Sequence, residues 1–360
     1  MKVLGIMNGT SGDGVDYVVA DLSFKKTWSV RFLQHEHKAF DKSFHEKTKR
    51  LITNVATTYE VGEFHHELGR LYAKHFSEIR WKHKPELIGL HGQTVYHRGG
   101  SATFQLGEPS YLSHQAKLPV IFNFRASDVA VGGQGAPLAP VLHKVLLSQF
   151  KEPVSFHNLG GISNLTFCHK KTWLAFDTGP ANTLMDIWIQ HKSQSKSLFD
   201  DSGTLASKGL PQLETVEKMI ANAYFKKASP KSCGREEFNL HFIQSHIDKK
   251  FPKLKIEDQL ATLTEVSAAS IYQAYKKFCP TMPKHIYFSG GGLQNKFFMQ
   301  RLKLYFGSDV VKSSEDLGWP SQAIEGGAFA LLAYMRAKEL RVDLRTITGG
   351  DKSSLLGQIC

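Results

Sequence analysis

Seven residues near the start of the chain, Asn8-Gly9-Thr10-Ser11-Gly12-Asp13-Gly14, combine groups that phosphate and metal chemistry use. Glycine accepts positive φ and lets a ligand approach the backbone. Successive N–H groups in such a turn form an anion site, to which Thr10 and Ser11 add hydroxyl donors. Asp13 and Asp16 are placed to hold the water shell of Mg²⁺, which proteins usually bind through one or two carboxylates and phosphates. The loop matches neither the P-loop lysine pattern nor G-x-G-x-x-G, and an ordinary hairpin turn remains an alternative.

A further carboxylate, Asp177, follows the apolar run 173–176 and precedes a Gly-Pro turn at Gly179. An aspartate at the end of a strand, before a turn and a helix, is well placed for chemistry. Helix capping is the alternative, but Asp177 lies too far before the helix predicted from Thr183 to cap it simply.

Polar groups also follow two short predicted strands. Gln93 and Thr94 come after the run 87–90 and offer the hydrogen bonds that sugars need, and we interpret the neighbouring His91 as a capping or core residue. In open α/β sheets, ligands lie beyond the carboxyl ends of the strands. Arg125 follows the strand 120–122 and can form a forked contact with a carboxylate, with a structural salt bridge to Asp128 as the alternative.

Two features near the end of the chain complete the candidates. Gly290, Gly291 and Gly292 separate the strand 285–289 from a helix predicted from Asn295, and they let a flat ring or a phosphate lie against the backbone. Glu325 stands in the first turn of the last predicted helix, where a glutamate also favours the helix dipole. The loop 229–236 carries two cationic side chains. It could contact the nucleotide or support the cleft, and the sequence does not distinguish the two roles.

The elements that must position these residues follow a repeated order. Glycine-broken strand pairs surround the first loop and, again, the Gly160-Gly161 turn at 154–168. The sequence predicts helices at 44–54, 59–81, 138–150, 183–192, 212–223, 258–278 and 323–339, and another from Asn295. The glycine- and proline-rich segment 130–137 predicts a domain boundary, which gives domains 1–128 and 129–360.

Composition restricts the class of protein. A chain of 360 residues with 41% hydrophobic residues suits two globular domains, and it has neither a bilayer-length apolar run nor a signal peptide. The four cysteines are scattered, which indicates reduced thiols and a cytoplasmic protein. The net charge of +12 is spread over pairs of basic residues, so a solvated surface that attracts anionic substrates is favoured over a nucleic-acid binder.

Eight motifs occur in a fixed order: GIMNGTSGDGVD, LHGQTVYHR, GGQGAPLAP, HNLGGISNLT, FDTGPANTLMD, SPKSCGREEFN, FSGGGLQN and AIEGGAFALLAY. This series resembles the anhydro-N-acetylmuramic acid kinase family, sugar kinases of the actin-like (sugar kinase/Hsp70) ATPase superfamily, from about Lys2 to the end. The chain departs from the family pattern at Asn8 (usually serine), Gly12 (usually large and apolar), Asn123 (usually aspartate) and Ala181 (usually glycine).

The resemblance implies an α/β fold with two actin-like (ribonuclease H-like) domains flanking a nucleotide/sugar cleft. It implies an ATP-dependent kinase of peptidoglycan recycling and amino sugar catabolism. Such a kinase converts 1,6-anhydro-N-acetylmuramic acid, water and ATP to N-acetylmuramic acid 6-phosphate and ADP. Because water is a poor nucleophile, the reaction needs a carboxylate base, and we expect Asp177 to be the catalytic residue.

The expected ATP-binding residues are Gly9, Thr10, Ser11, Gly12, Asp13, Gly14, Val15, Asp16, Gly179, Asn182, Gly290, Gly291 and Gly292. The expected sugar-binding residues are Gln93, Thr94, Arg125, Asp177 and Glu325, with Arg125 on the lactyl carboxylate. Asp13 and Asp16 would hold Mg²⁺, directly or through water. The expected partners are the sugar and ATP, without nucleic acid or membrane, and a homodimer is the assembly to consider. Another sugar kinase of the superfamily and a non-catalytic, ATP-regulated binding protein remain alternatives.

Overall fold

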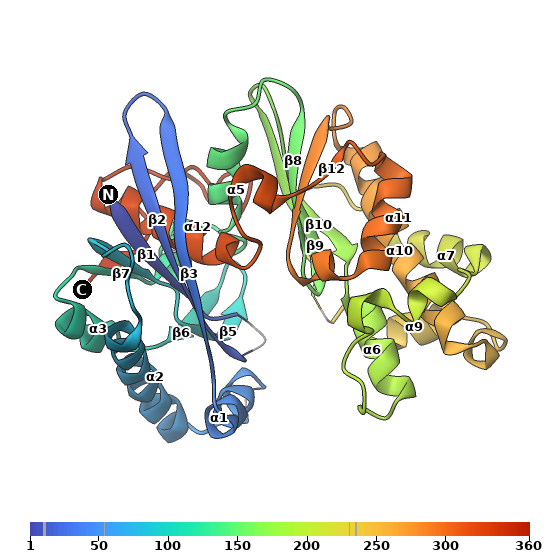
Figure 1. Cartoon of the computed structure of the whole chain (residues 1–360), viewed down its shortest axis with the longest axis horizontal. Coiled ribbons are helices and arrows are strands. Elements are labelled where there is room, and N and C mark those ends of the chain that lie inside the picture. The colour runs from blue at the N-terminus through green and yellow to red at the C-terminus, as the bar shows by residue number, and fades with distance from the viewer. Residues whose placement is uncertain (10–11, 54, 230, 235) are drawn as a thin grey trace. The chain divides into compact units, whose positions relative to one another are not determined.

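The computed structural model describes residues 1–9, 12–53, 55–229, 231–234 and 236–360 (Figure 1). These residues form two compact units. The first consists of Met1–Leu146 and Gly318–Cys360, and the second of Leu147–Leu317. No helix among the described residues is both long enough and apolar enough to cross a membrane.

The first unit is built on a six-stranded sheet with the order β13-β7-β4-β1-β2-β3. Its strands are β1 (Lys2–Met7), β2 (Gly14–Phe24), β3 (Trp28–Ala39), β4 (Leu87–Leu90), β7 (Val120–Phe122) and β13 (Gln358–Ile359). The first three strands pair antiparallel, whereas β1, β4 and β7 run parallel. A separate hairpin consists of β5 (Gln93–Arg98) and β6 (Ala102–Leu106).

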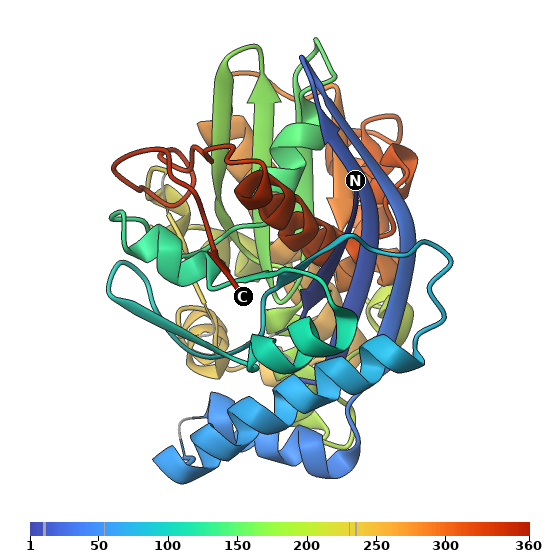
Figure 2. The ribbon, with the colours of Figure 1, turned by 90° about the vertical axis from the view of Figure 1, so that its left-hand side faces the viewer.

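Helices cover both faces of this sheet. They are α1 (Lys42–Ile52), α2 (Thr58–Glu78), α3 (Pro109–Ala116), α4 (Phe124–Val129), α5 (Pro140–Leu147) and α12 (Ala323–Ala337). Side chains alternate along a strand, so Leu4 and Ile6 pack in one core with residues of α1 and α2, while Gly5 faces α12. Figure 2 shows the ribbon of these elements in a view turned by 90°. A Cβ on Gly5 would lie 1.8 Å from the carbonyl oxygen of Gly326. The helix therefore approaches the sheet more closely than any larger residue would allow.

The second unit repeats this arrangement with the order β10-β9-β8-β11-β12. Its strands are β8 (Val154–Leu159), β9 (Ile162–His169), β10 (Thr172–Pro180), β11 (His285–Ser289) and β12 (Val311–Ser313). Its helices are α6 (Thr183–Lys192), α7 (Leu213–Ile220), α8 (Ala223–Lys226), α9 (Leu240–His246), α10 (Ile256–Phe278) and α11 (Lys296–Phe306). Most residues of the long helix α10 are buried, and eight of them belong to the hydrophobic core of this unit.

The two sheets share one topology. An antiparallel three-stranded meander is followed by two parallel strands on the side of its first strand, as β3-β2-β1-β4-β7 and as β10-β9-β8-β11-β12. This duplicated order is that of the actin-like fold, so the predicted fold class is confirmed.

The two compact units do not coincide with the predicted domains 1–128 and 129–360. The glycine-rich segment after α4 is tied to the first unit, because the N–H groups of Gly133 and Gly135 donate to Asp128, and the N–H of Gln134 donates to the carbonyl of Thr348. These hydrogen bonds keep residues 129–146 and the C-terminal residues in the first unit, and the change of unit falls at Leu147.

Candidate active site

Asp177 lies near the end of β10, where a bulge between Asp177 and Gly179 interrupts the pairing with β9. Bulges redirect side chains and are frequent next to active sites. The half-buried carboxylate accepts a hydrogen bond at Oδ2 from the N–H of Cys233 at 3.0 Å, and the Tyr224 hydroxyl donates to the Asp177 carbonyl at 2.7 Å. Asp177 is thus fixed through both its backbone and its side chain.

Burial raises the pKa of the Asp177 carboxyl to about 6, while the hydrogen bond from Cys233 and the charge of Lys231 act in the opposite direction. A carboxyl group with this pKa is mostly ionised at neutral pH and still binds a proton well. These are the properties of a general base. Asp177 therefore stays the predicted catalytic residue.

Gly179 and Asn182 follow Asp177 and have packing roles of their own. Gly179 has a φ of +139°, and a Cβ there would lie 2.6 Å from the Phe225 ring. The Asn182 side chain donates to the carbonyl of Gly160 at 2.8 Å and so supports the turn between β8 and β9. Both residues hold the backbone around the Asp177 strand end, and ATP contact by either remains a prediction.

The three glycines after β11 have different surroundings. Gly290 has a φ of +89°, and a Cβ on it would lie 2.6 Å from Oδ1 of Asn158. A Cβ on Gly292 would lie 2.6 Å from Cβ of Leu159. At Gly291, by contrast, no atom of the described residues lies within 4 Å of the Cβ position. Protein packing therefore explains Gly290 and Gly292, whereas Gly291 presents its backbone to open space.

Of the first loop in the other unit, Thr10 and Ser11 lie outside the described residues. Gly12 has a φ of +64°, and its N–H donates to the carbonyl of Gly9 at 3.2 Å. Where the loop enters β2, a Cβ on Gly14 would lie 2.7 Å from the ring of a neighbouring histidine on β3.

The residues at the start of β2 divide between core and surface. Val15 is buried, whereas Asp13 is exposed and Asp16 is half-buried. Oδ1 of Asp16 accepts hydrogen bonds from His35 at 2.8 Å and from His37 at 3.0 Å. Oδ2 receives none from the described residues, so this oxygen and the Asp13 carboxylate fit a hydrated Mg²⁺. In the described part of the chain, no group of three His, Cys, Asp or Glu side chains could hold a metal ion by itself. A Mg²⁺ ion here would therefore also need phosphate oxygens as ligands.

Arg125 lies in the first turn of α4 and is held by two acceptors in its own unit. Its Nε–H donates to Nε2 of His91 at 2.8 Å, and Nη1 donates to the carbonyl of Gly135 at 3.0 Å. The alternative salt bridge with Asp128 does not form, because Asp128 accepts instead from the N–H of Gly135 and the hydroxyl of Thr348. The guanidinium thus keeps donors on Nη2 that no described residue engages.

His91 has a role that the sequence interpretation missed. Burial and the neighbouring Arg125 charge lower the pKa of the His91 ring well below its usual value. The ring is therefore neutral and can accept the Arg125 Nε–H at Nε2, which orients the guanidinium. Its position directly after the buried strand β4 was the available signal.

Gln93 and Thr94 begin the hairpin strand β5. Gln93 is fully buried, and its amide Nε2 donates to the carbonyl of Gly9 at 3.3 Å. Its Oε1 has no hydrogen-bond partner among the described residues. The Thr94 hydroxyl accepts from Gln105 at 3.3 Å. Gln93 thus connects β5 with the first loop and keeps one unsatisfied acceptor.

Glu325 extends from the first turn of α12 and is exposed. Its charge attracts the guanidinium of Arg125 and is repelled by that of Asp16. The first unit therefore brings three of the predicted charged residues within interaction range of one another, from β2, α4 and α12.

Comparison with known proteins agrees with this arrangement along the whole chain. The model of the anhydro-N-acetylmuramic acid kinase family matches residues 1–360. The chain belongs to this family. An anhydro-N-acetylmuramic acid kinase of Picosynechococcus sp. is 35% identical over 375 aligned residues, which cover 100% of this chain and 99% of the relative. An anhydro-N-acetylmuramic acid kinase of Pasteurella multocida is 32% identical over 369 aligned residues, which cover 100% of this chain and 96% of the relative.

The structure accounts for two departures from the anhydro-N-acetylmuramic acid kinase pattern in the first loop. Asn8 accepts a hydrogen bond from the Tyr72 hydroxyl at 2.6 Å and donates to the carbonyl of Gly14 at 3.4 Å. At Gly12, a Cβ would lie 2.8 Å from Cγ2 of Thr48 on α1. Helix α1 therefore occupies the space that a larger side chain would need.

Two further departures from the family pattern are also compatible with the fold. Asn123 has a φ of +56°, a left-handed conformation that asparagine tolerates, and its amide donates to Oε1 of Gln358 at 3.0 Å. The methyl group of Ala181 is fully buried in the core of the second unit. None of the four departures removes a residue that we assign to catalysis.

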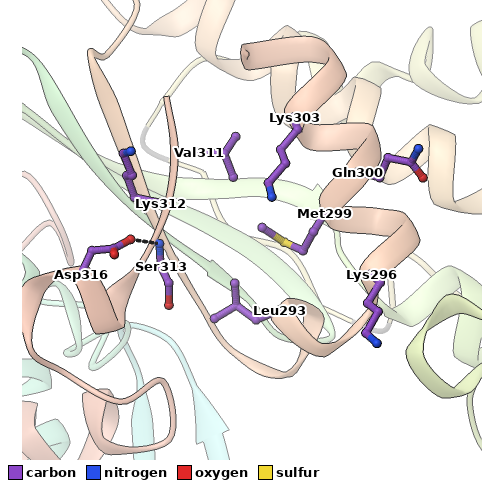
Figure 3. A pocket seen from close by; sticks show the side chains of 9 residues that line it. All are labelled: Leu293, Lys296, Met299, Gln300, Lys303, Val311, Lys312, Ser313 and Asp316. Atoms are coloured by element: carbon purple, nitrogen blue, oxygen red, sulfur yellow. Dashed lines mark hydrogen bonds between the residues drawn. The ribbon is translucent and has the colours of Figure 1, made fainter. Parts of the chain in front are cut away.

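A cavity of about 540 Å³ in the second unit lies outside the predicted site (Figure 3). It opens between α11 and β12, and three lysines and one aspartate contribute its charges. Its lining residues are Leu293, Lys296, Met299, Gln300, Lys303, Val311, Lys312, Ser313 and Asp316. None of the residues expected to bind the family's substrates lines this cavity.

Proposed function

We propose that this protein phosphorylates O6 of 1,6-anhydro-N-acetylmuramic acid with ATP while water opens the anhydro bridge, as the family name indicates. The products are N-acetylmuramic acid 6-phosphate and ADP. The observation that carries the proposal is the held carboxylate of Asp177, in a chain that matches the family from end to end. The partly buried environment raises the pKa of that carboxylate to about 6, which suits proton abstraction near neutral pH.

In this mechanism Asp177 accepts a proton from water as the water oxygen attacks C1 of the sugar. The bond between C1 and O6 breaks, and O6 takes the γ-phosphoryl group, so that ADP leaves. One proton is released overall when Asp177 returns to its ionised state. Phosphoryl transfer needs little covalent participation by the protein and depends on positioning and charge neutralisation.

The remaining residues bind and orient the substrates. The first loop and Gly291 would contact the nucleotide, while Arg125 would pair with the lactyl carboxylate and Glu325 with the sugar. Asp13 and Asp16 would hold Mg²⁺, which supplies positive charge next to the phosphates when bound.

The first test mixes the protein with Mg-ATP and the anhydro sugar in ¹⁸O-labelled water. We expect the label at the anomeric carbon of the first-formed 6-phosphate and none in the phosphate. Asp177→Asn should still bind both substrates, but its kcat should be lower by about 10²–10⁴-fold, the usual contribution of general-base catalysis. Label in the phosphate would show that ATP is hydrolysed first, which would contradict coupled ring opening.

A second test addresses the acidic group of the sugar. Arg125→Ala should raise KM for the anhydro sugar by the equivalent of about 1.5–3 kcal/mol, the range for a hydrogen bond to a charged group. An analogue without the lactyl carboxylate should be an equally poor substrate for both proteins. If the variant distinguishes the two sugars as well as the wild type does, Arg125 does not read the carboxylate.

A further inference from the structure

The loop 231–234 of the second unit, left unassigned from its sequence, contacts Asp177 through its backbone at two places. The N–H of Asp177 donates to the carbonyl of Lys231 at 3.1 Å, and the N–H of Cys233 donates to Oδ2 of Asp177 at 3.0 Å. The loop thus lies along the end of β10 as an added strand would. It holds one carboxylate oxygen, and Oδ1 receives no hydrogen bond from the described residues.

The side chain of Lys231 explains why this loop stays in place. Its ammonium group lies 4.6 Å from the ring centroids of Tyr224 and Phe278 and 5.7 Å from that of Phe176. It also donates a hydrogen bond to the Tyr224 carbonyl at 3.3 Å. A half-buried cation over aromatic faces is a strong and specific anchor. The Tyr224 hydroxyl in turn donates to the carbonyl of Asp177, so Tyr224 contacts both Lys231 and Asp177.

We propose that Lys231 and the Cys233 amide are positioning groups for Asp177, which fix Oδ2 and leave Oδ1 as the oxygen that takes the proton from water. The proposal rests on the proposed role of Asp177 as base. The charge of Lys231 also favours the ionised carboxylate, against the effect of burial. Cys233 acts through its backbone, since burial raises the pKa of its thiol to about 12 and keeps it protonated.

Lys231, Cys233 and Tyr224 face Asp177. Farther out, Lys227 and Lys277 act on the Lys231 charge, and Glu237 acts on Cys233 and Tyr224. Among these groups, only Lys231 brings a positive charge to bear on the Asp177 carboxylate.

The test compares five variants by kcat, KM for the sugar and the pH profile of kcat. Lys231→Met keeps the length of the side chain and removes its charge. We expect kcat to fall about tenfold, a part of the range for general-base catalysis, with KM nearly unchanged. The acidic limb of the profile should move upward by about half a unit or more, because the ionised base loses a stabilising charge. Lys231→Arg keeps the cation over the rings and should restore both values.

Two substitutions at Cys233 separate the amide from the side chain. Cys233→Ala keeps the N–H and is the reference for the proline variant at the same position. Cys233→Pro removes the donor to Oδ2 and should lower kcat and raise the acidic limb. Lys227→Met is the matched control, because Lys227 also lies over the Tyr224 ring, at 5.5 Å, but does not contact Asp177. It should change neither kcat nor the profile.

The outcomes distinguish this inference from the proposed function. If Asp177→Asn is inactive while Lys231→Met and Cys233→Pro keep the wild-type kcat and pH profile, the positioning role is wrong and the base assignment stands. If Asp177→Asn turns over like the wild type, the base assignment itself fails. Thermal unfolding of each variant shows whether it is folded. If Lys231→Met does not fold, the comparison of Cys233→Pro with Cys233→Ala decides the question.

Discussion

Asn8 connects the first strand of the chain with the helix that covers it. The residue is buried, and its side chain accepts the Tyr72 hydroxyl of α2 while it donates to the carbonyl of Gly14 at the far end of the loop. Tyr72 is itself fully buried, so its hydroxyl depends on this acceptor. A shorter side chain at position 8 cannot serve both partners.

Asn8→Ser, which introduces the usual family residue, should therefore lower the free energy of unfolding. We expect a loss of about 1–3 kcal/mol, the cost of a buried polar group left without a partner. Urea unfolding measures it. In a Tyr72→Phe background the same substitution should cost much less, and an equal cost in both backgrounds would show that the Tyr72 hydrogen bond is not the cause.

For single residues, the sequence predicted the candidate site residues but not the residues that contact them in the folded protein. Asp177 and Arg125 followed from strand ends and from family motifs. The acceptors that orient Arg125 did not, because His91 and Gly135 lie far from each other in sequence and meet Arg125 only in the folded unit. The contact of Cys233 with Asp177 likewise spans 56 residues, a separation that no local pattern reveals.

Among the elements, the three-glycine segment between β11 and α11 contains residues with two different roles, core packing and predicted ligand contact. Gly290 and Gly292 meet the end of β8, whereas Gly291 has open space at its Cβ position. Three consecutive glycines in the sequence therefore do not have one common cause, and substitution can separate the two causes.

Gly291→Val should leave the fold intact, because no described atom lies within 4 Å of the Cβ position. It should weaken ATP binding, because the branched side chain would occupy space that the nucleotide needs. Gly292→Ala should lower the free energy of unfolding by about 1–3 kcal/mol, as overpacking does. Calorimetric titration with ATP and thermal unfolding measure the two effects. Wild-type ATP affinity in Gly291→Val would mean that the nucleotide does not pass this glycine.

Long elements were predictable because many residues share one periodicity. The expected helices 59–81 and 258–278 correspond to α2 (Thr58–Glu78) and α10 (Ile256–Phe278). Helices α3 and α9 were not predicted, since seven or eight residues give only two turns of pattern. The predicted boundary after residue 128 differs from the change of compact unit at Leu147, because glycine-rich composition indicates a loop but not which unit the loop packs against.

At the scale of the whole molecule, acid stability depends on buried histidines. His143 on α5 is almost fully buried, and burial lowers the pKa of its ring to about 3. The folded protein thus keeps this ring neutral, while the unfolded chain binds a proton below pH of about 6.5. This stabilisation is complete above that pH and is lost as the pH falls. His91, with its lowered pKa, acts in the same direction.

His143→Gln should therefore make stability less dependent on pH. Between pH 7.5 and 5 the wild type should lose about 2 kcal/mol through His143 alone, and the variant should lose that much less. Urea unfolding at the two pH values provides the comparison. The same loss in both proteins would show that His143 does not control acid unfolding.

The order of the chain has a consequence for its biosynthesis. The second unit is one continuous segment, whereas the first is assembled from residues on both sides of it. Strand β1 leaves the ribosome before the second unit, but α12, which packs against its Gly5, is made only after the entire second unit. One face of the first sheet therefore stays uncovered throughout translation of Leu147–Leu317. A nascent chain stalled in that segment would present an apolar sheet to chaperones and proteases, even where its second unit had already folded.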